Sequence, residues 1–204
     1  MPDPKPRFNP TPDSSNKKEN SFADQIENIK EVFKLNPELE QIGTIEEYVK
    51  YLGTIFPESK VKAILYHGSN TEAEERFDSF SDEFIERTDG IGGSTLGRGY
   101  YFSPEYKDAE FYSDGWHVYA VVINTKNPLV HKYDSQEIND EYIRLPKNYK
   151  DIYDSVIGVD KNYGTEEQYV VFESNQIHIL GSKKDIENFR SWLENQKKEK
   201  NEAK

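Results

Sequence analysis

The sequence contains no cysteine. That absence excludes disulfide bonds, thiolate zinc sites and cysteine nucleophiles. The chain also lacks any apolar run long enough to span a bilayer, and residues 1–6 contain no apolar segment of the kind found in a signal peptide. We therefore expect a cytoplasmic location and no membrane partner.

Basic residues are few: 26 Lys and Arg stand against 38 Asp and Glu, which gives a formal net charge of −12. Such a charge favours solubility and argues against a broad nucleic-acid-binding surface, but it does not exclude a local basic groove. Hydrophobic residues are also sparse at 34%, yet 14 Tyr and 11 Phe are present, and each aromatic side chain can bury a large area. The sequence therefore predicts one compact domain with polar ends.

The first 60 residues divide into a polar segment and a helical one. Residues 1–20 are rich in Pro, Asn, Ser and Asp and are predicted to be disordered. Apolar residues recur at helical spacing across residues 22–35, and Thr44 with Glu47 forms a capping-box pattern that opens a second helix. Residues 21–60 are thus predicted to form a helical subregion that packs on the main domain.

A strand-like pattern begins after the helical subregion and defines a main domain over residues 61–195. The predicted strands cover residues 63–66, 99–102, 118–123, 155–159, 169–172 and 176–180. Only two predicted helices, near residues 104–113 and 183–195, accompany them, which indicates an α+β fold rather than a regularly alternating one. Residues 196–204 form a charged tail.

Three segments carry residues suited to chemistry. Residues 64–69 read Ile-Leu-Tyr-His-Gly-Ser, residues 97–102 read Gly-Arg-Gly-Tyr-Tyr-Phe, and residues 166–172 read Glu-Glu-Gln-Tyr-Val-Val-Phe. Each segment alone is compatible with an ordinary strand or turn. The glycines do not form a P-loop, because no Gly-Lys-Ser/Thr follows, and they do not open a helix as a dinucleotide fingerprint does. The information therefore lies in their joint order and spacing.

In that order and spacing the segments resemble ADP-ribosyltransferases of the diphtheria-toxin/poly(ADP-ribose) polymerase (His-Tyr-Glu) class, and most of all its small bacterial and phage polyvalent-protein-type members. The family's motifs are His-Gly-(Ser/Thr), Gly-x-Gly-x-Tyr-Phe with a second Tyr eleven residues later, and Tyr-(Val/Ile)-Val-(Tyr/Phe). Tyr101 and Tyr112 keep the eleven-residue separation, and the resemblance covers about residues 63–181. It implies an α+β fold with split antiparallel β-sheets around an NAD cleft.

The resemblance assigns NAD contacts to five residues. His67 would hydrogen-bond the ribose or adenosine-side hydroxyls. The backbone N–H and C=O of Gly68 would pair with the nicotinamide amide, which needs one donor and one acceptor. Ser69 would help to orient the cleft, and Tyr101 and Tyr112 would stack on the flat nicotinamide ring.

The catalytic position departs from the family pattern. Family members place a Glu directly before the Tyr of the third motif, where its carboxylate stabilises the positive charge that develops on the ribose. Here Gln168 stands at that position, with Glu167 and Glu166 just upstream. Three alternatives stay open: one of these glutamates supplies the charge, the enzyme is weak or restricted to mono-transfer, or the natural glutamate was changed to silence the enzyme.

A second departure is Ala109, which stands where many family members have a Ser that bonds the nicotinamide amide. The Gly68 backbone would then carry more of the recognition of that amide. Chain extension usually needs the intact Glu and an acceptor-site architecture, and the sequence shows neither, which favours mono-ADP-ribosylation of a macromolecular acceptor with release of nicotinamide. The loop before Tyr169, with Asn162, Tyr163 and Glu166, would face that acceptor. The acidic net charge slightly favours a protein over a nucleic acid. The alternative is a binding module that holds NAD or an ADP-ribose-like ligand without turnover.

The resemblance also bears on biological role and partners. It is compatible with a toxin or phage-type effector, with delivery into a host cell, and with a partner that acts as antitoxin or inhibitor. The remaining histidines, His117, His131 and His178, do not pair at metal-ligand spacing. We expect no metal site and a surface or structural role for these three side chains.

Overall fold

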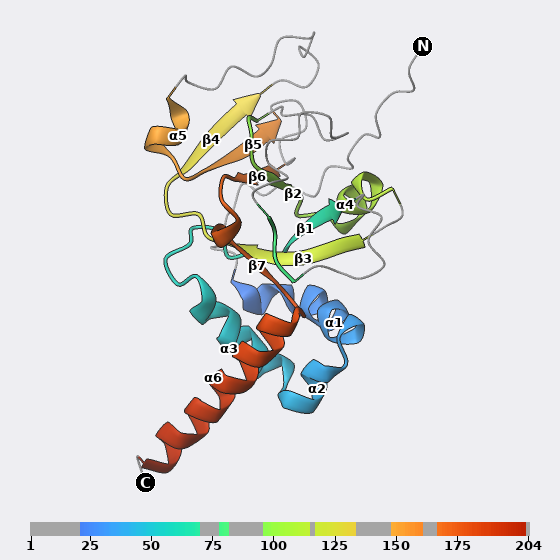
Figure 1. The fold of residues 1–204 in the computed structure, drawn as a ribbon, viewed down its shortest axis with the longest axis vertical. Helices are drawn as coiled ribbons and strands as arrows, with labels where there is room; N and C mark the ends of the chain where they lie inside the picture. Colours follow the sequence, from blue (N-terminus) through green and yellow to red (C-terminus); the bar gives the residue numbers. More distant parts are fainter. Residues whose placement is uncertain are drawn as a thin grey trace.

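The computed structural model describes residues 21–69, 78–81, 96–114, 117–133, 148–160 and 167–202. Its architecture is α+β, as the sequence predicts (Figure 1). The helices are a 3₁₀ turn η1 (Phe22–Gln25), α1 (Ile26–Leu35), α2 (Glu38–Ile42), α3 (Ile45–Ile55), α4 (Tyr106–Tyr112), α5 (Tyr149–Ile152), a 3₁₀ turn η3 (Ser174–Gln176) and α6 (Lys183–Glu202). The strands are β1 (Leu65–Ser69), β2 (Tyr100–Phe102), β3 (His117–Ile123), β4 (Pro128–Tyr133), β5 (Ser155–Asp160), β6 (Glu167–Val171) and β7 (Ile177–Ile179).

The N-terminal helices and α6 form a helical layer against one side of the strands (Figure 1). Its core is aromatic: the ring of Tyr48 packs edge-on against Phe33 at 5.3 Å and against Phe189 at 5.0 Å, measured between ring centroids. Val122 and Leu180 from the strand region are buried in the same cluster. The helical layer and the neighbouring sheet therefore share one hydrophobic core, as the sequence-based packing prediction requires.

The capping box predicted for the start of α3 is present. The hydroxyl of Thr44 accepts a hydrogen bond from the Glu47 backbone N–H at 3.2 Å, and the Glu47 carboxylate accepts one from the Thr44 N–H at 2.9 Å. These bonds satisfy two backbone donors that would otherwise lack a partner at the first turn. The local sequence alone therefore sets where this helix begins.

Two sheets pack face to face above the helical layer. One has the strand order β1-β3-β7 and the other β2-β6-β5-β4. Because side chains alternate along a strand, Tyr100 and Phe102 lie in the core between the sheets with Tyr119, whereas Tyr101 lies on the opposite face with Val170. The isolated pairing of Tyr66 in β1 with Ser103 joins the two sheets at one point.

The second sheet is mixed rather than wholly antiparallel. β4 pairs with β5 in parallel, from Pro128 opposite Ser155 to Tyr133 opposite Asp160, whereas the sequence predicted only antiparallel pairing. A parallel pair needs a crossover connection of about a dozen residues or more. The stretch between β4 and β5, which includes α5, supplies that length.

Other local differences from the prediction have simple causes. Strand β4 was not predicted; Pro128 opens it at the sheet edge, where a first position can do without an N–H. Helix α6 continues to Glu202, past the predicted end near residue 195, since Lys, Glu and Gln are good helix formers. The short helix α2 was not predicted. None of the helices within the described ranges is long and apolar enough to cross a membrane.

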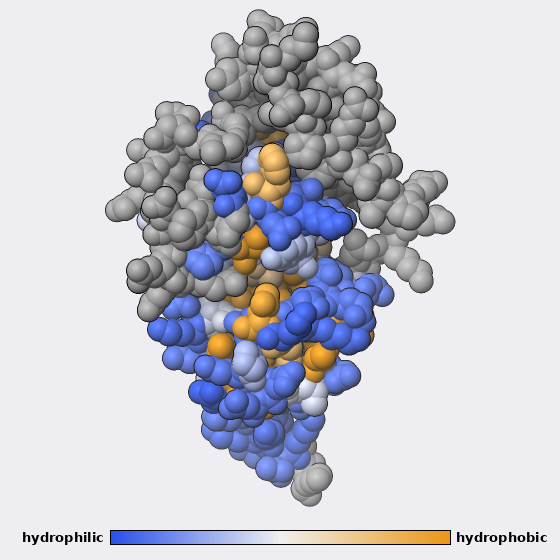
Figure 2. Space-filling model, turned by 90° about the vertical axis from the view of Figure 1, so that its right-hand side faces the viewer, coloured by the Kyte–Doolittle hydropathy of each residue, from blue (hydrophilic) through white to orange (hydrophobic). Residues whose placement is uncertain are grey.

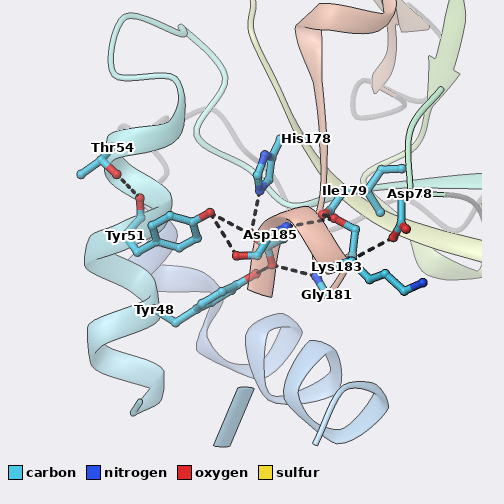
Figure 3. A network of polar contacts seen from close by, with 10 residues as sticks. Tyr48, Tyr51, Thr54, Asp78, His178, Ile179, Gly181, Lys183 and Asp185 are labelled. Atoms are coloured by element: carbon cyan, nitrogen blue, oxygen red, sulfur yellow. Dashed lines mark hydrogen bonds and ion pairs between the residues drawn. The ribbon is translucent and has the colours of Figure 1, made fainter. Parts of the chain in front are cut away.

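A buried carboxylate ties the helical layer to the strands (Figure 3). Asp185, in the first turn of α6, is fully buried and accepts hydrogen bonds from the hydroxyls of Tyr48 at 2.5 Å and Tyr51 at 3.1 Å. It also accepts bonds from the His178 ring at 2.7 Å and the Gly181 backbone N–H at 2.8 Å. Four donors from three parts of the chain thus converge on one side chain, which compensates for its burial.

Candidate functional site

His67 lies in the middle of β1, not at a strand end. Its Nδ1 is 2.8 Å from the backbone carbonyl oxygen of Tyr101, and its ring lies 4.9 Å from Phe80 and 5.6 Å from Phe102 between centroids. A carbonyl oxygen only accepts, so Nδ1 carries the hydrogen and Nε2 of the neutral ring is left as an acceptor. Burial lowers the pKa of His67, although its bond to Tyr101 opposes this. The residue therefore presents a neutral acceptor at neutral pH.

Gly68 presents its backbone polar groups to the edge of β1 that β3 does not cover. Its neighbour Tyr66 exchanges two backbone hydrogen bonds with Ser103, at 2.8 and 2.9 Å, across that edge. The N–H and C=O groups of a strand point alternately to its two edges, so those of Gly68 share the edge of Tyr66. One donor and one acceptor are thus placed beside the bridge between the two sheets.

The same glycine lies against the backbone of α4. A Cβ at Gly68 would overlap the carbonyl oxygen of Ala109 and would lie 2.8 Å from the Ser113 nitrogen. The sequence explained this glycine by close approach of a ligand to the backbone. The structure supplies a separate reason, because helix α4, which ends at Tyr112, can rest on β1 only if this position lacks a side chain.

We expect Gly68→Ala to lower the free energy of unfolding by about 2 kcal/mol or more, since the added methyl collides with rigid backbone. Gly53→Ala in α3 is the matched control: a Cβ there meets nothing within 4 Å, and alanine favours the helix, so stability should rise slightly. Urea denaturation followed by circular dichroism measures both changes. Equal stability of Gly68→Ala and the parent chain would contradict the packing described here.

Tyr101 is held by the turn that precedes its own strand. Its hydroxyl donates to the Gly97 carbonyl at 2.6 Å and accepts from the Leu96 backbone N–H at 2.9 Å. Gly97 has a φ of +86°, a conformation that side chains other than glycine's disfavour. Burial raises the pKa of Tyr101, which keeps the phenol neutral. The ring is therefore fixed in place on one face of the second sheet.

Tyr112 is presented differently, as the last residue of α4, and is 41% exposed. Its ring lies 5.5 Å from that of Phe111, edge to face, and Phe111 is itself 58% exposed. Figure 2 shows the side of the molecule with α1 and α4, where apolar side chains form a band bordered by hydrophilic ones. An exposed aromatic pair at the end of a helix that rests on Gly68 is available to a ligand.

Gln168 lies in β6, opposite Gly158 in β5, and is half-buried. It is two residues from Val170 and so shares its face of the sheet with Tyr101. Within the described part of the chain its carboxamide makes no hydrogen bond, which leaves both of its polar atoms available. Glu167 is the first residue of β6, opposite Val159.

Three residues predicted to act at the site or to face the acceptor, namely Glu166, Asn162 and Tyr163, lie outside the described residues. Ser69 is the last residue of β1, is buried and lies opposite His117.

The comparison with known families agrees with this geometry. The sequence model for the ADP-ribosyltransferase domain of polyvalent proteins matches residues 61–185, which is more than half of the chain. The chain belongs to this ADP-ribosyltransferase family. No curated protein matches the chain. The match includes β1 through β7 and stops at Asp185, so the N-terminal helices and most of α6 lie outside it.

The structure of this family member brings several predicted positions together. The His67 ring bonds the Tyr101 backbone, the Gly68 backbone contacts the helix that carries Tyr112, and the Tyr101 side chain shares a sheet face with Gln168. The rings of His67 and Tyr101 do not lie side by side: His67 packs on Phe102 between the sheets, whereas the Tyr101 ring lies on the opposite face of the second sheet. These contacts place the three sequence motifs around the junction of β1, β2, α4 and β6. The NAD contacts themselves stay predictions.

Sequence reasoning missed two residues beside these motifs. Ser103 joins the sheets through its backbone, and its hydroxyl donates to the Asp108 carboxylate at 2.6 Å. It directly follows the second motif, which is the signal that could have found it. Phe80 packs its ring against His67 from a polar stretch of sequence that gave no such signal.

The other histidines lie elsewhere in the ADP-ribosyltransferase domain. His178 bonds Asp185, the ring of His117 lies 6.1 Å from that of Tyr119, and His131 is in the edge strand β4. Among the residues that the structure describes, no group of three His, Cys, Asp or Glu side chains is arranged to hold a metal ion.

Proposed function

We propose that the chain is an NAD-dependent mono-ADP-ribosyltransferase that transfers ADP-ribose to a macromolecular acceptor. The observation that carries this proposal is the bond from the His67 ring to the Tyr101 carbonyl, which joins the first two motifs beside the edge of β1 to which the Gly68 backbone groups point. Membership of the family supports the reaction class. The acceptor and a role as toxin-like effector belong to the proposal and not to the family match.

NAD would be recognised mainly by uncharged groups. Neutral His67 offers Nε2 as an acceptor for a ribose hydroxyl, because Nδ1 is already committed to Tyr101. Gly68 offers one N–H and one C=O to the nicotinamide amide. Ala109 has no hydroxyl to share that task, so the Gly68 backbone would carry it alone. Tyr112 is exposed enough to stack on the ring.

The reaction breaks the bond between the ribose C1 and the nicotinamide nitrogen. Nicotinamide leaves as a neutral molecule with the bonding electron pair, and the positive charge passes to the ribose. An acceptor nucleophile then bonds C1 and releases a proton. Gln168 can hydrogen-bond a ribose hydroxyl but brings no negative charge, so Glu167 or Glu166 would have to supply one.

Gln168 also favours a second candidate, an NAD-binding module without turnover. Titration of the chain with NAD in a calorimeter, together with measurement of nicotinamide release and of label transfer from labelled NAD to a lysate, separates the candidates. Release or transfer supports the enzyme. Binding without either supports the module. Absence of NAD binding would overturn both, and digestion of the labelled lysate with protease or nuclease reports the acceptor class.

NAD binding should depend on pH through His67. Its pKa lies below the ordinary value of 6.5, so the ring stays neutral and binding stays constant above that pH. Below the lowered pKa, Nε2 gains a proton, loses its acceptor role, and the affinity should fall about tenfold per pH unit.

Titrations from neutral to acidic pH measure this dependence, with circular dichroism at each pH to confirm that the chain stays folded. His67→Asn keeps a donor for the Tyr101 carbonyl and serves as the control. This variant should bind NAD more weakly, and its affinity should not fall further at acidic pH. If the NAD affinity of that variant still falls at acidic pH, the pH dependence comes from another group.

A further inference from the structure

Two cations and two aromatic rings meet on the second sheet. The ammonium of Lys150 in α5 lies 4.8 Å from the ring centroid of Phe172, and the ring of Tyr149 meets Phe172 edge to face at 5.6 Å. Arg98 directly follows Gly97, whose carbonyl binds the hydroxyl of Tyr101 in the same cluster as Tyr149, and a backbone contact from Arg98 lowers the pKa of Tyr149 against the effect of burial. We name these four residues, Arg98, Tyr149, Lys150 and Phe172, the cation patch.

The cation patch has no acidic partner in the part of the chain that the structure describes. Arg98 and Lys150 are exposed, and within the described ranges neither forms an ion pair with a carboxylate. Glu173, the residue after Phe172, instead accepts a hydrogen bond from the Asn175 amide. Burial lowers the pKa of Lys150, and the nearby positive charge of Arg98 lowers it further. Two adjacent cations that have no acidic partner among the residues that the structure describes are a local exception in a chain with 38 acidic residues, and a bound anion would stabilise them.

The patch is continuous with the candidate active site. Tyr149 and Phe172 pack on the same cluster of side chains as Tyr101, and Arg98 directly follows Gly97, whose carbonyl binds the Tyr101 hydroxyl. Phe172 is four residues beyond Gln168, which corresponds to roughly 13 Å along an extended strand. A polymer held at the cation patch can therefore reach the position where transfer would occur.

We propose that the cation patch docks the phosphates of a single-stranded nucleic acid, one at each cation, and presents that strand as the acceptor. This inference rests on the proposed function. Cations beside aromatic rings are the combination that binds single strands, because phosphates pair with the charges while bases stack on the rings. The patch is open to solvent, as a passing polymer requires. A patch this small is compatible with the acidic charge of the rest of the chain. It makes a nucleic acid the proposed acceptor, in place of the protein that net charge alone favoured.

The test uses the full chain and a fluorescein-labelled single-stranded oligonucleotide of about 12 nucleotides, as RNA and as DNA. Arg98→Gln/Lys150→Gln should weaken binding about tenfold and reduce the slope of log affinity against log salt by about 1.4, for two lost phosphate contacts. Lys30→Gln/Lys34→Gln in α1 removes the same charge from residues paired with Glu27 and Glu31 and should leave binding unchanged.

NAD titration of the same variants distinguishes this proposal from the proposed function. Retained NAD affinity with lost oligonucleotide binding supports the cation patch as an acceptor site. A parallel loss of NAD affinity would assign the two cations to the donor's diphosphate and overturn the proposal. So would failure of the parent chain to bind the oligonucleotide, or equal binding by the patch variant, whether or not NAD is cleaved. Unchanged melting temperatures confirm that both variants are folded.

Discussion

Gln168→Glu is expected to raise the rate of ADP-ribose transfer by about 10²- to 10³-fold. The carboxamide lies on β6 on the same sheet face as Tyr101, and its polar atoms make no hydrogen bond within the described part of the chain. The family resemblance assigns this position to the ribose, so a carboxylate there would add a negative charge where positive charge develops. Removal of a single preorganised electrostatic contact changes rates by this factor in other enzymes. Nicotinamide release under saturating NAD measures the change.

Two further variants show which residue supplies the charge. Gln168→Met keeps the length of the side chain without polar atoms, so it should lose any contact to a ribose hydroxyl and give no gain in rate. Glu167→Gln should leave the Gln168→Glu variant active if position 168 is the catalytic one. A slower Gln168→Glu enzyme, combined with loss of activity in Glu167→Gln, would place the catalytic charge at Glu167 instead.

Asp185→Asn should lower the free energy of unfolding by about 3 kcal/mol. The carboxylate is fully buried and accepts from the hydroxyls of Tyr48 and Tyr51, the His178 ring and the Gly181 N–H. An amide has only one acceptor oxygen and turns an N–H₂ group toward donors. Loss of one partner in a buried charged network carries a cost of this size. Urea denaturation of the two chains measures the difference.

Glu187→Gln is the matched control for this loss, since Glu187 lies on the same helix but is exposed. Its effect should stay within about 0.5 kcal/mol. Tyr51→Phe removes one of the four donors and should cost about 1 kcal/mol. A change of less than about 1 kcal/mol in Asp185→Asn would show that the network contributes little to stability, whatever its geometry.

The features that the sequence predicted correctly are local ones. The capping box at Thr44 and Glu47, the helical spacing over residues 22–35 and the α+β order of the main domain depend on near neighbours in the chain. The family resemblance was confirmed because it rests on motif order. The NAD contacts assigned to the residues around His67 stay predictions; His67 meets Tyr101 at its backbone carbonyl, while the Tyr101 ring lies on the other face of the second sheet.

The features that the sequence did not predict depend on contacts between distant segments. The parallel pairing of β4 with β5 leaves no mark on either strand, because a single strand does not show its partner's direction. The Asp185 network draws donors from positions more than 130 residues apart along the chain. The cation patch likewise joins Arg98 to Lys150 and Phe172. The members of these two groups can be recognised only once the three-dimensional structure is known.

The family match ends at the very carboxylate that holds the helical layer in place. A fragment cut at residues 61–185 would lose both tyrosine donors and Phe189, and it would leave Val122 and Leu180 facing water. We therefore expect the segment that matches the family, residues 61–185, to be less stable without the flanking helices. When this segment is joined to another protein, the new neighbour would have to bury Val122 and Leu180 as the flanking helices do here.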